Sequence, residues 1–295
     1  MTCPLCDKSV KVNETDPVAH TYETTYTIND EYHWFKCVNC GDANGKEFHT
    51  LDDEGSCTIC QLPVSSTPGV VYEVSADGTY AEVIGYGGTA TKVKIASEYN
   101  GVPVTKIYYN AFVNNKTITN VVIGDSVTSI GDYAFYYCTS LTSVVIGDSV
   151  TSIGSYAFSY CSSLTSVVIP DSVTSIGDYA FYYCFSLTTV KMCNSLTNIG
   201  DGAFWSTFLT SIVIPDSVTI IGTYAFHSCV DLTSVVIGNG VTNIGYMAFN
   251  NSYKLTNIAF NGNIEQWNSI AKGTKWNERV PATEVICSDG TVTLK

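Results

Sequence analysis

The chain has 295 residues, of which 45% are apolar and only 14% are charged, and its net charge is −13. Nucleic-acid binding needs clustered lysine and arginine, so an acidic chain whose one arginine is Arg279 excludes that class of partner. No apolar run reaches the length of about 18 residues that a membrane-spanning helix needs, which excludes membrane insertion as well.

The opening stretch MTCPLC lacks the basic and apolar regions of a signal peptide. A cytoplasmic protein and a chain cut from a longer precursor both fit this observation. The first residues therefore leave the localisation open.

Residues 1–62 contain three Cys-x-x-Cys pairs and are expected to form a small zinc-ribbon-like Cys/His module. Sixteen residues separate the second pair from the third, which is the spacing of a zinc ribbon. So small a module lacks a core large enough to fold alone, and bound metal would supply the missing free energy. We expect a structural zinc ion on four thiolates: Cys37, Cys40, Cys57 and Cys60.

The first cysteine pair needs other partners. A possible second zinc site joins Cys3 and Cys6 with His20 and His33, and His49 could replace a cysteine in either site. Disulfides in a secreted chain are an alternative. A redox Cys-x-x-Cys is a weaker alternative, because no thioredoxin-like pattern surrounds the pairs.

Residues 63–69 are rich in proline, serine and threonine and are predicted to be a linker. Beyond it the chain repeats itself every 23 residues, with one step of 22, around an Ala-Phe pair. A fixed period in this range predicts a solenoid in which each repeat is one coil. The repeated phenylalanines are Phe112, Phe135, Phe158, Phe181, Phe204, Phe226 and Phe249.

One coil can be followed residue by residue. Val144 and Ile146 alternate with outward positions, as in a half-buried strand, and Gly147-Asp148 then turns the chain. Gly154 makes a corner, and the Ala-Phe-x-x-Cys stretch is short enough to predict one helical turn or a 3₁₀ piece. Stacked coils would bury each phenylalanine against the next.

The stretch LTSVVIPDSVTSIGDYAFYYC strongly resembles the repeats of BspA-like leucine-rich repeat proteins, which occur on the surfaces of anaerobic bacteria and in some parasitic protists. The resemblance implies an α/β-type repeat solenoid, strand-rich with short helical turns, behind the zinc-ribbon-like module. It implies a capping hairpin at Asp77-Gly78 with a leading strand (70–110), about seven coils (111–262) and a C-terminal cap (263–295). In that cap, a short helix is expected to lay Trp267 and Ile270 over the last coil.

Two repeated positions are expected to be structural. One holds Cys138, Cys161, Cys184 and Cys229, with Thr207 interrupting, and predicts a column of small buried thiols. The other holds Asp125, Asp148, Asp171 and Asp216, where turn chemistry explains the carboxylates better than calcium does, since one carboxylate per coil gives too few ligands.

Two other repeated positions are candidate binding surfaces. The tyrosine stripe could offer binding hot spots or could serve only to stack its rings for stability; it comprises Tyr136, Tyr137, Tyr160, Tyr182, Tyr183 and Trp205, beside a tyrosine column at Tyr133, Tyr156, Tyr179 and Tyr224. The valine row is predicted to point outward as an apolar patch and comprises Val122, Val145, Val168, Lys191, Val213, Val236 and Ala259.

No nucleophile–base pair stands at a workable position, and His227 is expected to be a surface substitution in the stripe. We therefore predict a non-enzymatic protein- or glycan-binding repeat protein, and the resemblance implies surface adhesion or host-component recognition. The alternative is an intracellular zinc-containing scaffold for protein–protein interaction.

Overall fold

The structure is a computed structural model that describes residues 27–28, 32–36, 43–48 and 66–294. The chain divides into two units, Met1–Gly69 and Val70–Lys295. In the first unit, β1 (Thr27–Ile28), β2 (Tyr32–Lys36) and β3 (Ala43–Phe48) form an antiparallel sheet in that order. The division falls at the end of the predicted linker.

The second unit begins with a hairpin of β4 (Val70–Val74) and β5 (Ala81–Tyr86). Asp77 accepts hydrogen bonds from Ser75 and Thr79 in its turn, and Gly78 takes the positive φ of 70° that the turn needs. β5 then pairs in parallel with β8 (Val102–Ile107), beside which β7 (Glu98–Tyr99) lies antiparallel. The hairpin thus covers the open end of the solenoid, as the sequence predicts.

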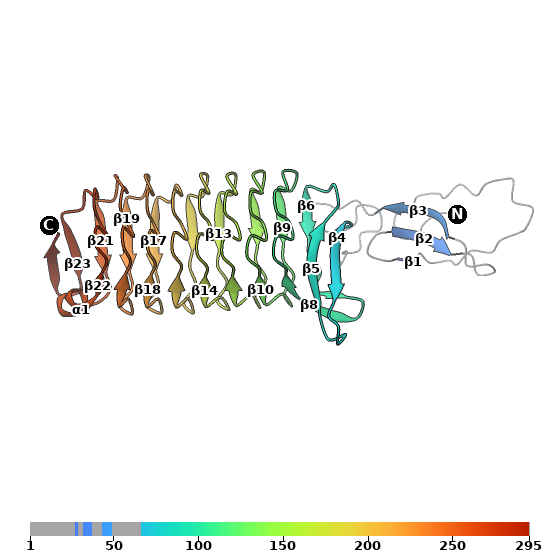
Figure 1. The fold of residues 1–295 in the computed structure, drawn as a ribbon, viewed down its shortest axis with the longest axis horizontal. Helices are drawn as coiled ribbons and strands as arrows, with labels where there is room; N and C mark the ends of the chain where they lie inside the picture. Colours follow the sequence, from blue (N-terminus) through green and yellow to red (C-terminus); the bar gives the residue numbers. More distant parts are fainter. Residues whose placement is uncertain (1–26, 29–31, 37–42, 49–65, 295) are drawn as a thin grey trace, which may run out of the picture. The chain divides into compact units, whose positions relative to one another are not determined.

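Each coil adds one short strand to each of two parallel rows, and the coils lie in chain order along the stack (Figure 1). The first row runs through β6 (Lys92–Lys94), β9 (Asn120–Val122), β11 (Ser143–Val145), β13 (Ser166–Val168), β15 (Thr189–Lys191), β17 (Ser211–Ile214), β19 (Ser234–Ile237) and β21 (Asn257–Phe260). The second row follows β8 through β10 (Ser129–Ile130), β12 (Ser152–Ile153), β14 (Ser175–Ile176), β16 (Asn198–Ile199), β18 (Ile220–Ile221), β20 (Asn243–Ile244) and β22 (Ala271–Lys272). Equivalent residues pair across coils, as Val144 does with Val121.

The third side of the coil is made of turns, so the predicted helical turn around Ala-Phe is wrong. Tyr133 and Tyr137 both have positive φ, 57° and 62°, and a right-handed helix cannot continue through such residues. Successive backbone amides alternate between two kinds of acceptor. The amide of Tyr136 donates to the Tyr133 carbonyl within the same turn, and the amide of Phe135 donates to the Ala157 carbonyl of the next coil. The same pair of positive-φ residues recurs in every turn: Asn110/Asn114, Tyr156/Tyr160, Tyr179/Tyr183, Gly202/Ser206, Tyr224/Ser228, Met247/Asn251 and Lys275/Arg279.

A continuous column of phenylalanines fills the core. From Phe112 to Phe249 successive rings stack with centroids 4.8–5.3 Å apart, and all seven side chains are buried. The corner glycine is required by the close approach of neighbouring coils, since a Cβ on Gly154 would lie 2.6 Å from the Asp132 amide nitrogen. Both observations confirm the predicted stack of layers.

The C-terminal end is closed by a short helix, α1 (Ile264–Ser269), as predicted. Asn263 and Gln266 form a capping box at its start, and Trp267 and Ile270 are buried over the last coil. The chain then continues the stack through β22 and an eighth turn at Lys275–Arg279, which the sequence did not reveal. A hairpin of β23 (Glu284–Cys287) and β24 (Gly290–Thr293) ends the first row.

Candidate binding surfaces

The valine row lies on the outer face of the first row of strands. Val145, Val168 and Val213 are 55%, 59% and 61% exposed, whereas Val236 and Ala259 are half-buried. Parallel, in-register pairing of Val122 with Val145, and of Val213 with Val236, spaces these side chains by about 4.8 Å. The predicted outward direction of the row is confirmed, and its function in binding stays a prediction.

The row is longer than the sequence indicated. Ile286 in β23 pairs with Ala259 and is 50% exposed, which adds an apolar position at the C-terminal end. At the other end Lys94 of β6 pairs with Val122. The row is therefore bounded by a lysine at Lys94 and interrupted by a second lysine at Lys191.

A column of threonines links successive coils on this face by hydrogen bonds. In the coil of Val145, both the amide and the hydroxyl of Thr142 donate to the carbonyl of Thr119 in the preceding coil, at 2.8 and 2.9 Å. Further hydroxyls in this column repeat the contact to the threonine one coil earlier: Thr119, Thr165, Thr188, Thr233 and Thr256. The sequence pattern offered no reason to expect these bonds, and they fix the spacing of the valine side chains beside them.

The aspartates of the turn that follows the row are exposed. Asp216 accepts hydrogen bonds from the amide of Asn239, at 2.9 Å, and from the side chain of Asn261, at 3.0 Å. These two bonds, that from Asn261 above all, hold the pKa of the Asp216 carboxyl below its ordinary value. The predicted structural function in the turn is confirmed at this residue.

The tyrosine column is a face-to-face stack. Tyr133 and Tyr156 lie 4.8 Å apart and Tyr156 and Tyr179 lie 4.9 Å apart, with ring planes only 7° and 12° from parallel. Gly202 supplies no ring in the next coil, and Trp205 fills the gap by stacking 5.0 Å from Tyr224. Both faces of the inner rings are covered by their neighbours, so only ring edges and hydroxyls face outward.

The tyrosine stripe is less regular. Tyr137, Tyr160 and Tyr183 follow one another with tilted rings at 5.4 and 5.2 Å, and Tyr136 and Tyr182 contact Tyr160 edge-on. Tyr137 is exposed, and the other members are half-buried. The predicted aromatic stripe therefore exists, but most of its surface is used in contacts between rings.

Two exposed aromatic residues next to the stripe were missed. Phe185 and Phe208 lie at the same corner of adjacent coils, 6.1 Å apart, and Phe185 also contacts Tyr183. They occupy the position at which earlier coils have Thr139 and Ser162. Two phenylalanines in successive coils, where the two preceding coils have small polar residues, were the signal that could have revealed them.

The cysteine column is buried, as predicted. The thiols of Cys138, Cys161, Cys184 and Cys229 are fully buried, and each donates to the carbonyl of a phenylalanine in a preceding coil at 3.1–3.2 Å. Burial raises the pKa of the Cys138 thiol to about 12. Ser252 makes the same bond to Phe226, so the position selects a small side chain that can donate.

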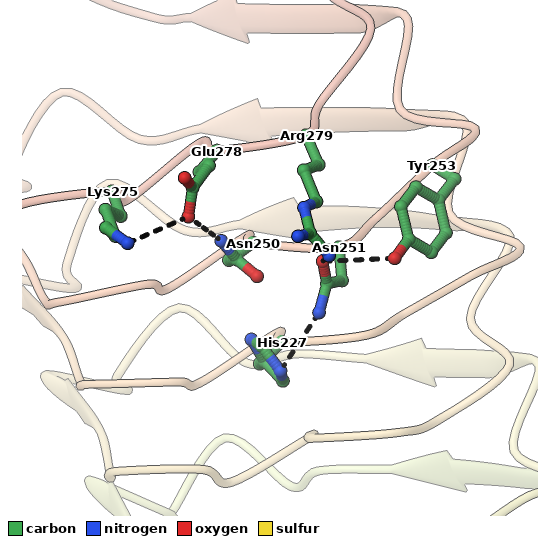
Figure 2. A network of polar contacts seen from close by, with 7 residues as sticks. All are labelled: His227, Asn250, Asn251, Tyr253, Lys275, Glu278 and Arg279. Carbon is green, nitrogen blue, oxygen red and sulfur yellow. Dashed lines mark hydrogen bonds and ion pairs between the residues drawn. The ribbon is translucent and has the colours of Figure 1, made fainter.

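A polar network replaces the aromatic rings near the C-terminal end (Figure 2). Its centre is Asn251, whose side chain contacts Nε2 of His227 at 3.5 Å, the Tyr253 hydroxyl at 3.1 Å and Arg279 at 3.3 Å. His227 is half-buried with its ring 4.8 Å from Trp205, so it is less exposed than a surface substitution would be. Burial lowers the pKa of His227. The hydrogen bonds of Asn251 link the turns that contain His227 and Arg279.

Comparison with known proteins identifies the repeat. The description "BspA type Leucine rich repeat region" matches in six copies, over residues 105–229 and 197–271. The chain belongs to the BspA-type leucine-rich repeat family. No curated protein matches the chain.

Three solved structures are similar to this BspA-type chain. The leucine-rich repeat protein of T. pallidum is 31% identical, covers 64% of this chain and 90% of its own, and has a TM-score of 0.61. A leucine-rich cell surface protein of Faecalibacterium prausnitzii is 30% identical over 75% of each chain, with a TM-score of 0.48. A leucine-rich repeat protein of Bacteroides capillosus is 34% identical over 43% of this chain and 98% of its own, with a TM-score of 0.39.

The predicted zinc sites lie in the other unit, outside the BspA-type matches. Only His33 falls on a described strand, β2, where its backbone pairs with Ile28 and Glu47. The remaining predicted ligands lie outside the described residues: Cys3, Cys6, His20, Cys37, Cys40, His49, Cys57 and Cys60. Within the described part of the chain, no three histidine, cysteine or acidic side chains gather at a point where they could hold a metal ion.

Across the described ranges of this BspA-type protein, no helix is long and apolar enough to cross a membrane. The one α-helix of the second unit's described residues, α1, has six residues. The fold is thus a strand-rich solenoid with very little helix.

Proposed function

We propose that the solenoid is a non-enzymatic recognition module that docks a protein partner through the valine row. One observation carries this proposal: exposed valines occupy the equivalent outward position in four coils of the first row of strands, at Val122, Val145, Val168 and Val213. Contiguous apolar patches on soluble proteins mark interaction sites. Leucine-rich repeat proteins generally bind protein ligands, which supports the same conclusion.

A protein partner fits this surface better than a glycan does. Sugar rings bind proteins by stacking on a free aromatic face, and the inner rings of the tyrosine column have both faces covered by neighbouring rings. The valine row offers branched aliphatic side chains, which pack well against other apolar side chains. Because BspA-type proteins are typically surface-associated, we place this recognition at the cell surface, in adhesion or the binding of host components.

The test uses the full chain and an array of purified extracellular-matrix proteins and receptor ectodomains. A partner retained by the wild-type chain should bind the V145S/V168S/V213S variant about tenfold or more weakly, because the three most exposed apolar side chains of the row are removed. The matched control is T151S/T174S/T197S, one residue before each of three strands of the second row, where serine keeps the hydroxyl that bonds to the preceding coil. Equal binding by wild type and the valine variant would overturn the proposal.

We also propose that residues 1–62 hold structural zinc. The support is the spacing of Cys37 and Cys40 from Cys57 and Cys60. Elemental analysis of the purified full chain should find zinc, and C57S/C60S should lower the zinc content by one ion per chain, whereas C138S should not. Zinc-free protein with its N-terminal cysteines in disulfides would contradict this proposal and the intracellular scaffold together.

A further inference from the structure

Three consecutive coils join an exposed valine to an exposed aspartate. Asp125, Asp148 and Asp171 each follow a residue of the valine row by three positions. Three residues of chain span at most about 11 Å, so the carboxylates border the valines along one side. We call these six residues the acidic valine patch: Val122, Val145, Val168, Asp125, Asp148 and Asp171.

The three carboxylates of the patch differ from the aspartates of the turn side. Among the described residues, no hydrogen bond or ion pair is found for the side chains of Asp125, Asp148 and Asp171. On the turn side, Asp132, Asp178 and Asp201 each accept the amide of a residue in the next coil, at 2.6–2.8 Å. The patch therefore carries one unneutralised carboxylate in each of its three coils.

The patch ends at the coil in which both the valine and the aspartate are replaced. In the next coil the valine row has Lys191 and the aspartate position has Asn194. One coil further, Val213 is followed by Asp216, whose carboxylate is already bonded to Asn239 and Asn261. On the N-terminal side Lys94 pairs with Val122. Lysines thus bracket the patch at both ends.

We infer that the acidic valine patch binds a cationic protein segment in which aliphatic side chains alternate with lysine or arginine. The valines would take the aliphatic side chains, and the free carboxylates would pair with the cations. Charge complementarity of this kind sets specificity and speeds association, and the bracketing lysines would repel a segment shifted along the stack. This inference rests on the proposed docking function and adds to it the chemistry of the partner.

The experiment selects binding segments from a random pool. A phage library of random 12-residue peptides is panned on the full chain, and the enriched peptides are synthesised and titrated by fluorescence anisotropy. The expected selection is enriched in lysine and arginine interleaved with aliphatic residues, with affinity that falls as salt rises. Enrichment of acidic or uncharged peptides would overturn the inference.

Two triple variants with the same change in charge separate a specific site from general attraction. D125N/D148N/D171N should weaken binding of the enriched peptides about tenfold. D132N/D178N/D201N removes the same charge from the turn side, keeps an acceptor for each amide, and should change binding by less than about twofold. Equal loss in both variants would show attraction to the acidic chain as a whole and would overturn the inference.

Two further variants distinguish this inference from the docking function on which it rests. V122S/V145S/V168S should lose binding as well. If the valine variant loses binding and the patch aspartate variant does not, the docking surface stands and the cationic partner is wrong. K191V/N194D, which adds a fourth valine–aspartate pair, should strengthen binding about threefold, and unchanged or weaker binding would contradict the patch as defined.

Discussion

The two repeated surfaces of the coil differ in what their side chains contact. On the strand side, Val145 and Val168 point outward, and each residue is more than half exposed. On the turn side, Tyr133, Tyr156 and Tyr179 cover one another's ring faces. Repetition alone thus does not make a surface available for binding. In a column of large rings each ring covers the faces of its neighbours, whereas small branched side chains in a row leave one another exposed to solvent.

The largest expected effect is on stability, at the break in the tyrosine column. Gly202 contributes no ring, so Trp205 is the ring that connects Tyr179 to Tyr224. Trp205→Ala should lower the free energy of unfolding by about 3 kcal/mol, as measured by urea denaturation. Phe208→Ala, at an exposed corner of the same coil, should cost under about 1 kcal/mol, and an equal loss in the two variants would contradict a structural column.

The buried thiols predict a loss of stability at alkaline pH. The pKa of Cys138 is raised from 9.0 to about 12, so the unfolded thiol ionises before the folded one does. The contribution of this thiol to the free energy of unfolding is fully present below pH 9 and decreases as the pH rises toward 12. At pH 10.5 the free energy of unfolding should be lower by about 2 kcal/mol. C138S places at this position the residue type that Ser252 supplies in a later coil. Its denaturation should show a shallower decline with pH, and an unchanged decline would contradict the assignment.

A third test separates ring stacking from backbone strain. Tyr156 has a φ of 57°, which glycine adopts without strain, but its ring stacks on two neighbours. Tyr156→Gly should therefore lower the free energy of unfolding by about 1–2 kcal/mol, less than the loss of two ring contacts alone. Stabilisation by this change would mean that relief of strain outweighs stacking, and the column would not be structural.

The smallest expected effect is on the strand side. Val145→Ser removes an exposed methyl pair and should change the free energy of unfolding by less than about 0.5 kcal/mol. A two-state urea titration at neutral pH measures this difference. A loss above about 1 kcal/mol would mean that the valine row is part of the packing, and the contrast between the two surfaces would fail.

Much of the second unit could be predicted because one coil constrains the next. Because equivalent residues of neighbouring coils pair in register, their side chains point the same way in each coil. The alternation at Val144 and Ile146 was therefore enough to predict that the valine row points outward. The period of the Ala-Phe pair predicted the stacked phenylalanines in the same way. Where the repeat is strict, the sequence pattern within one coil is therefore enough to predict how that coil packs against the next.

The turn side could not be predicted to the same extent. Positive φ is uncommon for tyrosine, and at Tyr133 and Tyr137 it is imposed by hydrogen bonds to the next coil. The stacking of Tyr156 between two tyrosines follows from that backbone, so the pattern alone left binding and stability as open alternatives. The eighth turn was missed because Lys275 and Arg279 share no residue type with the earlier turns.

The central claim, that a partner contacts the valine row and not the tyrosine stripe, is tested most directly by site-specific photo-crosslinking. Full-length protein with benzoylphenylalanine at Val168 or at Tyr160 is irradiated together with a protein retained on the array. We expect a crosslinked product from Val168 and none from Tyr160, whose ring lies among other rings. A product from Tyr160 alone would contradict the account and make the tyrosine stripe the binding surface.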